Sequence, residues 1–149
     1  MKKLLVLVLF CCIFTLGCNK ADEVNSEKDS ITREALDMGM KQSDSGNLEA
    51  VLATYTKAIE QVKDNANLYV DRGRVKSELG DLDGALDDIN KGLALSEEGW
   101  IYAERAVVYK MKEENKLALE DYKKALSLDP SMDWVRDVIK ELESQPEGN

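Results

Sequence analysis

The stretch Tyr69-Val-Asp-Arg-Gly73, which leads into Gly80-Asp-Leu-Asp-Gly-Ala85, is repeated along the chain. Thirty-three residues after Tyr69 the sequence has Tyr102-Ala-Glu-Arg-Ala106, and a fainter copy lies upstream, between residues 35 and 58. Three copies with a period of about 33 residues are typical of proteins built from stacked structural repeats. The repeat therefore predicts a solenoid in which each unit packs mainly on its neighbours.

Each copy predicts two helices joined by a short turn. Gly80 permits the left-handed backbone that ends a helix, and Asp81 is placed to cap the next one. The third copy has Glu113 where this glycine would fall, so we expect Asn115 to take the left-handed conformation instead. In the second copy the apolar face of the later helix has helical spacing, at Leu82, Ala85, Leu86, Ile89 and Leu93.

These patterns resemble the tetratricopeptide repeat, in which aromatic and small residues occupy fixed positions of a unit of about 34 residues. The resemblance implies an all-α solenoid over residues 31–144, with repeats at about 32–65, 66–98 and 99–132. Two such repeats are well matched, and the first is more divergent. The matching residues are Gly39, Tyr55, Ala58, Tyr69, Gly73, Ala85, Tyr102, Ala106, Tyr109, Ala118, Tyr122, Ala125 and Pro130.

A comparison of the copies points to an ion pair inside the repeats. Arg72 and Asp88 occupy unit positions 7 and 23 of the second repeat, and Arg105 and Asp121 occupy the same positions of the third. The first repeat has neither charge, so the two are present or absent together. We expect an Arg–Asp pair that links the two helices of a repeat, the alternative being that all four are solvated surface charges.

The residues after Pro130 predict a capping helix over 131–144, followed by a tail at 145–149. Solenoids need an end helix with a polar outer face. We expect Trp134 to lie in the core against the third repeat rather than to offer an exposed platform for a ligand. The apolar positions with helical spacing are Trp134, Val135, Val138, Ile139 and Leu142.

The N-terminus has the pattern of a secretory signal. Lys2 and Lys3 precede an uncharged apolar run from residue 4 to residue 16, which is shorter than the ~20 residues of a transmembrane helix. The run ends in Gly17-Cys18, which resembles a bacterial lipobox, although Thr15 departs from the usual leucine. This implies a signal peptide over 1–17 and a lipid, such as palmitate, on Cys18. An ordinary secreted protein cut near Gly17 and an uncleaved anchor are the alternatives.

Residues 18–30 are expected to form a flexible tether between the lipid and the repeats, because the segment is polar and lacks an apolar period. Asn19 replaces the aspartate that retains many such lipoproteins at the inner membrane. The expected location is therefore the cell envelope, at the periplasmic face of the outer membrane.

Composition disfavours several classes of function. The formal net charge of −9 opposes binding to nucleic acid, and the chain has no histidine, which is the commonest general base and metal ligand. The segment Asp81-Leu-Asp-Gly84 is similar to part of a calcium loop, but Leu79 and Asn90 fall where acidic ligands are required. We expect no enzyme activity, catalytic residue, metal, cofactor or small-molecule substrate.

The resemblance also implies a concave groove that is lined by the first helix of each repeat and takes a protein or peptide. Members of the family that bind chaperone tails carry Lys and Asn at unit positions 5 and 9, and this chain does not. Acidic residues recur at position 6, namely Asp37, Asp71 and Glu104. An amphipathic partner with some positive charge is therefore expected. The expected groove residues are Arg33, Leu36, Met40, Val70, Arg74, Trp100, Ala103 and Val107.

The pattern leaves three functions open. The first is a membrane-anchored adaptor that brings one protein partner to the envelope. The second is an assembly factor similar in layout to the pilotin-type lipoproteins of outer-membrane or secretion complexes. The third is a structural module that associates with itself through the groove.

Overall fold

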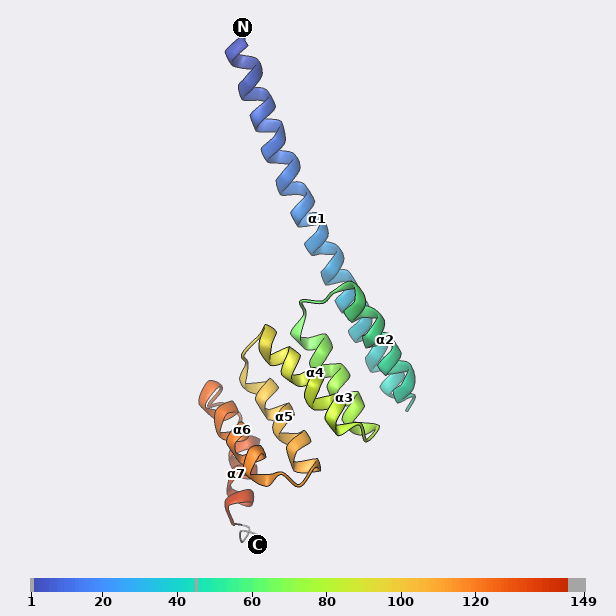
Figure 1. The fold of residues 1–149 in the computed structure, drawn as a ribbon, viewed down its shortest axis with the longest axis vertical. Coiled ribbons are helices and arrows are strands. Elements are labelled where there is room, and N and C mark those ends of the chain that lie inside the picture. Colours follow the sequence, from blue (N-terminus) through green and yellow to red (C-terminus); the bar gives the residue numbers. More distant parts are fainter. Residues whose placement is uncertain (1, 45, 145–149) are drawn as a thin grey trace.

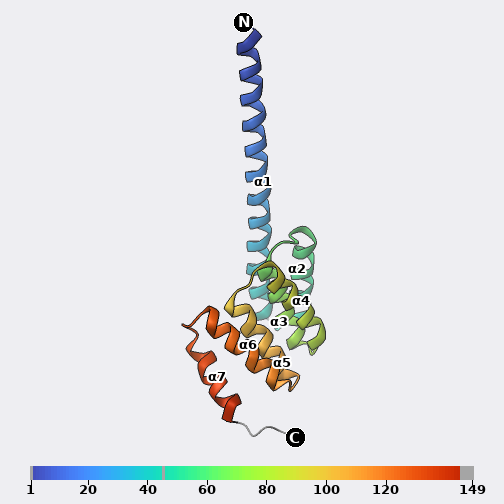
Figure 2. The same ribbon diagram turned by 60° about the vertical axis from the view of Figure 1, so that its left-hand side comes forward.

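The computed structural model describes residues 2–44 and 46–144, with side chains from residue 21 onward. A long helix, α1, projects from a body of shorter helices, as both views show (Figures 1 and 2). No strand occurs in this part of the chain, so the predicted all-α fold is confirmed. The helices are α1 (Lys2–Asp44), α2 (Leu48–Gln61), α3 (Ala66–Glu78), α4 (Leu82–Leu95), α5 (Gly99–Met111), α6 (Asn115–Leu128) and α7 (Asp133–Ser144).

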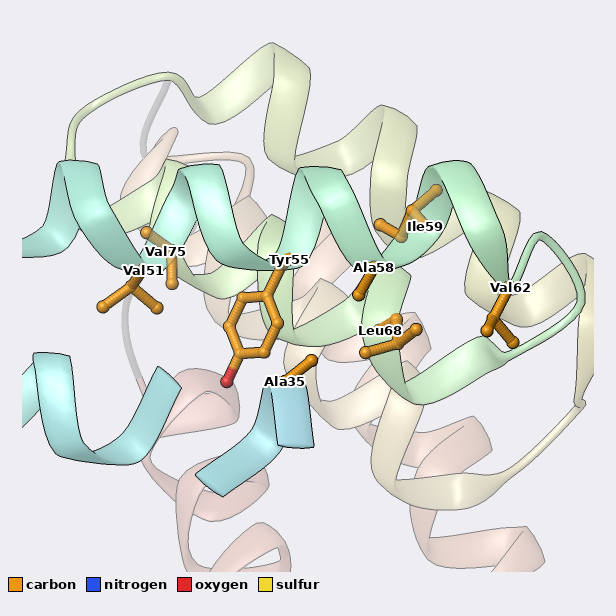
Figure 3. Close-up of a cluster of buried hydrophobic side chains, with 8 residues drawn as sticks. All are labelled: Ala35, Val51, Tyr55, Ala58, Ile59, Val62, Leu68 and Val75. Atoms are coloured by element: carbon orange, nitrogen blue, oxygen red, sulfur yellow. The ribbon is translucent and has the colours of Figure 1, made fainter. Parts of the chain in front are cut away.

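Consecutive helices pack in pairs, and each apolar core is shared between neighbouring repeats. The C-terminal part of α1, together with α2 and α3, encloses the first core, in which the ring of Tyr55 points from α2 toward Ala35 of α1 (Figure 3). Helices α3, α4 and α5 enclose the second core, and α5, α6 and α7 the third. Because every core joins one repeat to the first helix of the next, no repeat buries its apolar face alone.

Close helix packing depends on small residues at the crossing points. A Cβ atom added at Gly73 would lie 2.9 Å from Cγ1 of Ile89 and 3.0 Å from the carbonyl oxygen of Ala85. A methyl group there would push α3 away from α4, at a cost of about 1–3 kcal/mol. The recurring small residue of the sequence pattern therefore sets the distance between the two helices.

The turns follow the predicted chemistry with one correction. Gly80 has a φ of +86°, and the Asp81 carboxylate accepts a hydrogen bond from the Gly84 amide at 3.0 Å. In the third repeat Glu113 itself takes the left-handed conformation, with a φ of 62°, and the prediction for Asn115 is wrong because Asn115 is the first residue of α6. The Glu114 amide donates a hydrogen bond of 2.9 Å to the Tyr109 carbonyl, which closes the end of α5. This bond requires the left-handed conformation at Glu113.

The structure also differs from the prediction of a flexible tether, because residues 19–30 belong to α1. The prediction rested on the missing apolar period, but a helix that is already anchored by packing can extend without one. The segment contains no Gly or Pro, and Lys28 forms an ion pair with Asp64 at 2.6 Å. Twelve helical residues rise about 18 Å.

The predicted Arg–Asp pairs are confirmed. Arg72 donates two hydrogen bonds of 2.7 Å to the carboxylate of Asp88, and Arg105 donates bonds of 2.7 and 2.8 Å to Asp121. Burial would raise the pKa of Asp88, but hydrogen bonds from Arg72 and Lys76 lower it below its ordinary value. The carboxylate is therefore charged and satisfied, although it is almost fully buried.

Each arginine also reaches the repeat before its own. A third nitrogen of Arg72 donates to the Thr56 hydroxyl of α2 at 3.4 Å, and the same atom of Arg105 donates to the Asn90 side chain of α4 at 2.7 Å. Each arginine therefore joins three helices. In the first repeat Met38 and Thr54 occupy the two positions of the ion pair, and the Thr54 hydroxyl donates to the Met38 sulfur at 3.8 Å.

The prediction that Trp134 lies in the core is wrong, because this side chain is 51% exposed. Helix α7 instead buries Val135, Ile139 and Leu142, and Trp134 lies one residue outside that register. Its indole packs on the ring of Tyr122, edge to face, with centroids 6.1 Å apart.

We predict strong coupling between Arg105 and Asp121. In a double-mutant cycle with Arg105→Met and Asp121→Asn, each single change leaves a half-buried group without its partner and costs about 2–3 kcal/mol of unfolding free energy. The double variant loses less than the sum, which gives a coupling energy of about 1–2 kcal/mol. Urea unfolding measures the four stabilities.

The exposed pair Lys140–Asp137 provides the matched control for this cycle, since its two charges lie 3.1 Å apart on the surface of α7. We expect no measurable coupling there. Additive effects at Arg105 and Asp121 would contradict the assignment of the pair as a link between helices.

Candidate functional site

The first helices of the repeats share a surface that bears two hollows. One hollow has a volume of about 370 Å³. It is lined by Leu36 of α1, Asn67 and Asp71 of α3, Glu98, which precedes α5, and Trp100 of α5. A second hollow, of about 230 Å³, lies between α1, α2 and α3 and is lined by Gly39, Met40, Ser43, Asp44, Val51, Tyr55, Arg74, Val75 and Glu78. We call this surface of α1, α3 and α5 the groove.

Four predicted groove residues lie at these hollows, namely Leu36, Met40, Arg74 and Trp100. Val107 is 37% exposed on α5, one helical turn after Glu104. Arg33 is also exposed, but it lines a hollow formed by α1 residues alone, with Ser30, Glu34, Asp37, Met38 and Lys41.

Val70 and Ala103 do not line the groove, which corrects the expectation for these two residues. Val70 is 1% exposed and packs in the core formed by α3, α4 and α5. A Cβ atom added at Gly92 would lie 2.6 Å from its Cγ2 atom, which shows how tightly it is enclosed. Ala103 is 2% exposed and faces α6 and α7. In the second and third repeats, unit position 5 therefore belongs to the helix interface, and the following position faces outward.

The outward position brings two carboxylates to the groove, Asp71 of α3 and Glu104 of α5. Arg74 donates a hydrogen bond of 2.7 Å to Asp71, whereas its nearest nitrogen lies 3.9 Å from Glu104, beyond hydrogen-bonding distance. Burial raises the pKa of both carboxyls, an effect that the charge of Arg74 partly opposes. Asp71 and Glu78 raise the pKa of Glu104 further through their negative charge.

Nearby negative charges also raise the pKa of two tyrosine hydroxyls. The pKa of Tyr122 is raised to about 12, first by burial and then by the charges of Glu104 and Glu141. Burial and the charge of Asp71 raise the pKa of Tyr55. Negative charge from α3, α5 and α7 therefore acts along this side of the solenoid.

The sequence pattern places Asp71 and Glu104 at the border of the groove, whereas it assigns Glu141 to the polar outer face of the capping helix. The repeat period could have indicated its position. Glu141 lies 34 residues after Val107, and Trp134 lies 34 residues after Trp100. Helix α7 thus continues the outward positions of the repeats.

Exposed methionine side chains lie on the first helices α1 and α5. Met40 is 60% exposed, and Met111, which lies 33 residues after Glu78, is half-exposed. Methionine side chains adapt to partners of irregular shape. The groove therefore offers carboxylates, one arginine and flexible apolar contacts, a combination suited to recognition of a protein segment.

Comparison with known proteins identifies one repeat and relates the fold to known domains. Residues 101–132 match the tetratricopeptide repeat family model. The structure resembles the first such domain of Spaghetti (RPAP3) bound to the HSP90 peptide SRMEEVD, with a TM-score of 0.69 and 22% identity over 74% of this chain and 94% of that one. Residues 101–132 therefore form a tetratricopeptide repeat, and the chain has the fold of tetratricopeptide-repeat domains.

Two further proteins extend the comparison. A thermophilic tetratricopeptide-repeat protein of Thermus thermophilus, TTC0263, has a TM-score of 0.64 and 27% identity over 70% of this chain and 54% of that one. Human DnaJ homolog subfamily C member 7 is 30% identical over 115 residues, which are 73% of this chain. The chain spans 22% of the length of that relative.

We predict that Glu104→Gln raises the melting temperature at pH 7. Burial raises the pKa of Glu104, so the folded state binds its proton more tightly and the charged form carries a penalty above that pKa. The penalty is absent once both states are protonated, below the ordinary value of 4.5. The advantage of the variant should therefore shrink as the pH falls from 7 to 4 in thermal unfolding experiments.

Glu120→Gln is the control, because Glu120 is exposed on α6 and the same charge is removed. We expect no comparable stabilisation for it. A lower melting temperature for Glu104→Gln than for the wild type at pH 7 would show that the carboxylate has a structural role.

Proposed function

We propose that this tetratricopeptide-repeat protein is a lipid-anchored adaptor of the bacterial envelope that holds a protein or peptide partner in its groove. The observation that carries the proposal is the pair of half-buried carboxylates, Asp71 and Glu104, set among exposed apolar side chains on the first helices. The Spaghetti domain, whose fold this chain shares, is bound to a peptide. Exposed methionines beside charged groups are typical of surfaces that receive a partner.

The side chains of the groove are of kinds that recognise a protein segment. Among the described residues, no group of three or more His, Cys, Asp and Glu side chains is placed to hold a metal ion. The groove residues offer ion pairs, hydrogen bonds and apolar contacts, which serve recognition of a partner.

Site-specific photocrosslinking in the native envelope tests the adaptor function. We expect benzoylphenylalanine at Val107 or Met40 to give a discrete protein adduct, because both positions are exposed along the groove. The control is the same group at Leu117, which is similarly exposed but lies on α6, a second helix of a repeat.

The outcomes separate the candidate functions. An adduct with a soluble protein supports the adaptor, and an adduct with a multimeric outer-membrane component identifies an assembly factor. A dimer of this chain identifies self-association. Equal adducts at Leu117 and Val107, or none at Val107 and Met40, contradict the groove as the binding surface.

The proposed anchor rests on the sequence alone. The signal segment 1–17 and the side chain of Cys18 lie outside the residues whose side chains the structure describes. Within the described part of the chain, none of the helices combines the length and apolar character needed to span a bilayer. A lipid with two or three acyl chains on Cys18 would hold the protein stably, since each buried methylene contributes about 0.8 kcal/mol.

We predict that Cys18→Ala abolishes incorporation of an alkyne analogue of palmitate and moves the repeats out of the stably membrane-bound fraction. Cys11→Ala is the matched control, because that cysteine lies within the expected signal peptide and should not affect labelling. Undiminished labelling of the Cys18→Ala variant would exclude this anchor.

A further inference from the structure

We propose that the groove selects a partner segment that carries lysine or arginine among apolar residues, with a cationic side chain placed between Asp71 and Glu104. This inference rests on the proposed function, since it names the chemistry of the partner. It concerns the described surface of α1, α3 and α5.

Glu104 lacks a strong hydrogen-bond donor. Its carboxylate accepts no hydrogen bond from the described residues, and its closest cationic neighbour is the Arg74 nitrogen at 3.9 Å. The side chain is only 29% exposed, so water replaces these bonds incompletely. A half-buried carboxylate without a strong donor is costly unless a partner supplies one. An ammonium or guanidinium group is the donor that matches its charge.

The balance of charge in the groove also favours a cation. Asp71, Glu78 and Glu104 contribute three negative charges at one place, and Arg74 contributes one positive charge. Arg74 already donates its short hydrogen bond to Asp71, so it is poorly placed to clamp the carboxylate of a ligand. An acidic segment such as the SRMEEVD peptide of the Spaghetti complex would meet repulsion here. A basic segment would meet attraction.

Apolar side chains lie beside the acidic residues of the groove. Leu36 and Trp100 line the same hollow as Asp71, so one wall beside this carboxylate is apolar and aromatic. The Trp100 indole nitrogen donates to Glu98 at 2.8 Å, which fixes the ring. The aliphatic stem of a lysine or arginine can pack on such a wall while its charged end reaches the carboxylates. Exposed Met40 and Val107 then contact apolar neighbours of the cation in the partner segment.

Arg74 has a distinct role in this arrangement. Its guanidinium partly neutralises the two carboxylates in the unbound protein, and a cationic ligand competes with it for the same oxygens. Removal of this arginine should therefore strengthen binding of a basic segment. A purely structural Arg74 would instead leave binding unchanged or weaken it.

The test uses the full-length protein in detergent micelles and a random dodecapeptide library with Lys, Arg, Asp and Glu at equal frequency. The expected result is an excess of Lys and Arg over Asp and Glu among the selected peptides. The selected basic peptide is then labelled, and its affinity is measured by fluorescence anisotropy. We expect roughly a tenfold or greater loss for Asp71→Asn/Glu104→Gln and a several-fold gain for Arg74→Gln.

A matched control separates local from overall charge. Asp87→Asn/Glu120→Gln removes the same two charges from exposed positions of α4 and α6, which are equivalent to each other in the repeat. This variant should bind the selected peptide within about twofold of the wild type, because distant surface charges are screened. A comparable loss of peptide affinity in both double variants would overturn the proposed cation-binding site.

The remaining outcomes are also decisive. Selection of acidic or uncharged peptides overturns the inference and leaves the groove as a peptide-binding surface. If the wild type selects no peptide, both the inference and the proposed function fall. Because burial raises the pKa of both Asp71 and Glu104, the double variant should remain folded at pH 7, and thermal unfolding of that variant separates a loss of binding from unfolding.

Discussion

The ion pairs Arg72–Asp88 and Arg105–Asp121 fix how successive helix pairs meet, and the groove depends on that geometry. Each arginine holds the second helix of its own repeat with two hydrogen bonds and reaches the preceding repeat with a third nitrogen. Because a guanidinium is planar and its donors are rigidly placed, the pair constrains orientation as well as distance. The first helices are thereby held in register, so residues one period apart face the same side.

The ion pairs were predictable from an alignment of the three repeats. The second and third repeats contain both the arginine and the aspartate, and the first repeat contains neither. Position 5 of the second and third repeats was not placed correctly, because its burial depends on the rotation of each first helix against two neighbours. Val70 and Ala103 are small and apolar, which suits either a groove or an interface. Only their contacts with the following helices decide between the two.

Other differences share a cause, which is that local patterns compete with longer-range constraints. Glu113 adopts a left-handed backbone against its own preference, because the hydrogen bond that closes α5 requires that conformation at its place in the chain. Residues 19–30 lack an apolar face, yet they extend a helix whose later part is held in the first core. Trp134 is the largest apolar side chain of α7, yet the spacing of Val135, Ile139 and Leu142 determines which face is buried.

The contrast between two kinds of buried carboxylate argues that the groove is a binding surface. Asp88 is more deeply buried than Asp71 or Glu104, yet its pKa is lowered, because Arg72 and Lys76 donate hydrogen bonds to it. The pKa of Asp71 and of Glu104 is raised by burial, an effect that the charge of Arg74 offsets only in part. The same scaffold therefore gives Asp88 several donors, whereas on the groove Asp71 has the one bond from Arg74 and Glu104 has no hydrogen bond from the described residues. Such a deficit costs stability in the unbound protein, and a cationic partner removes that cost on binding.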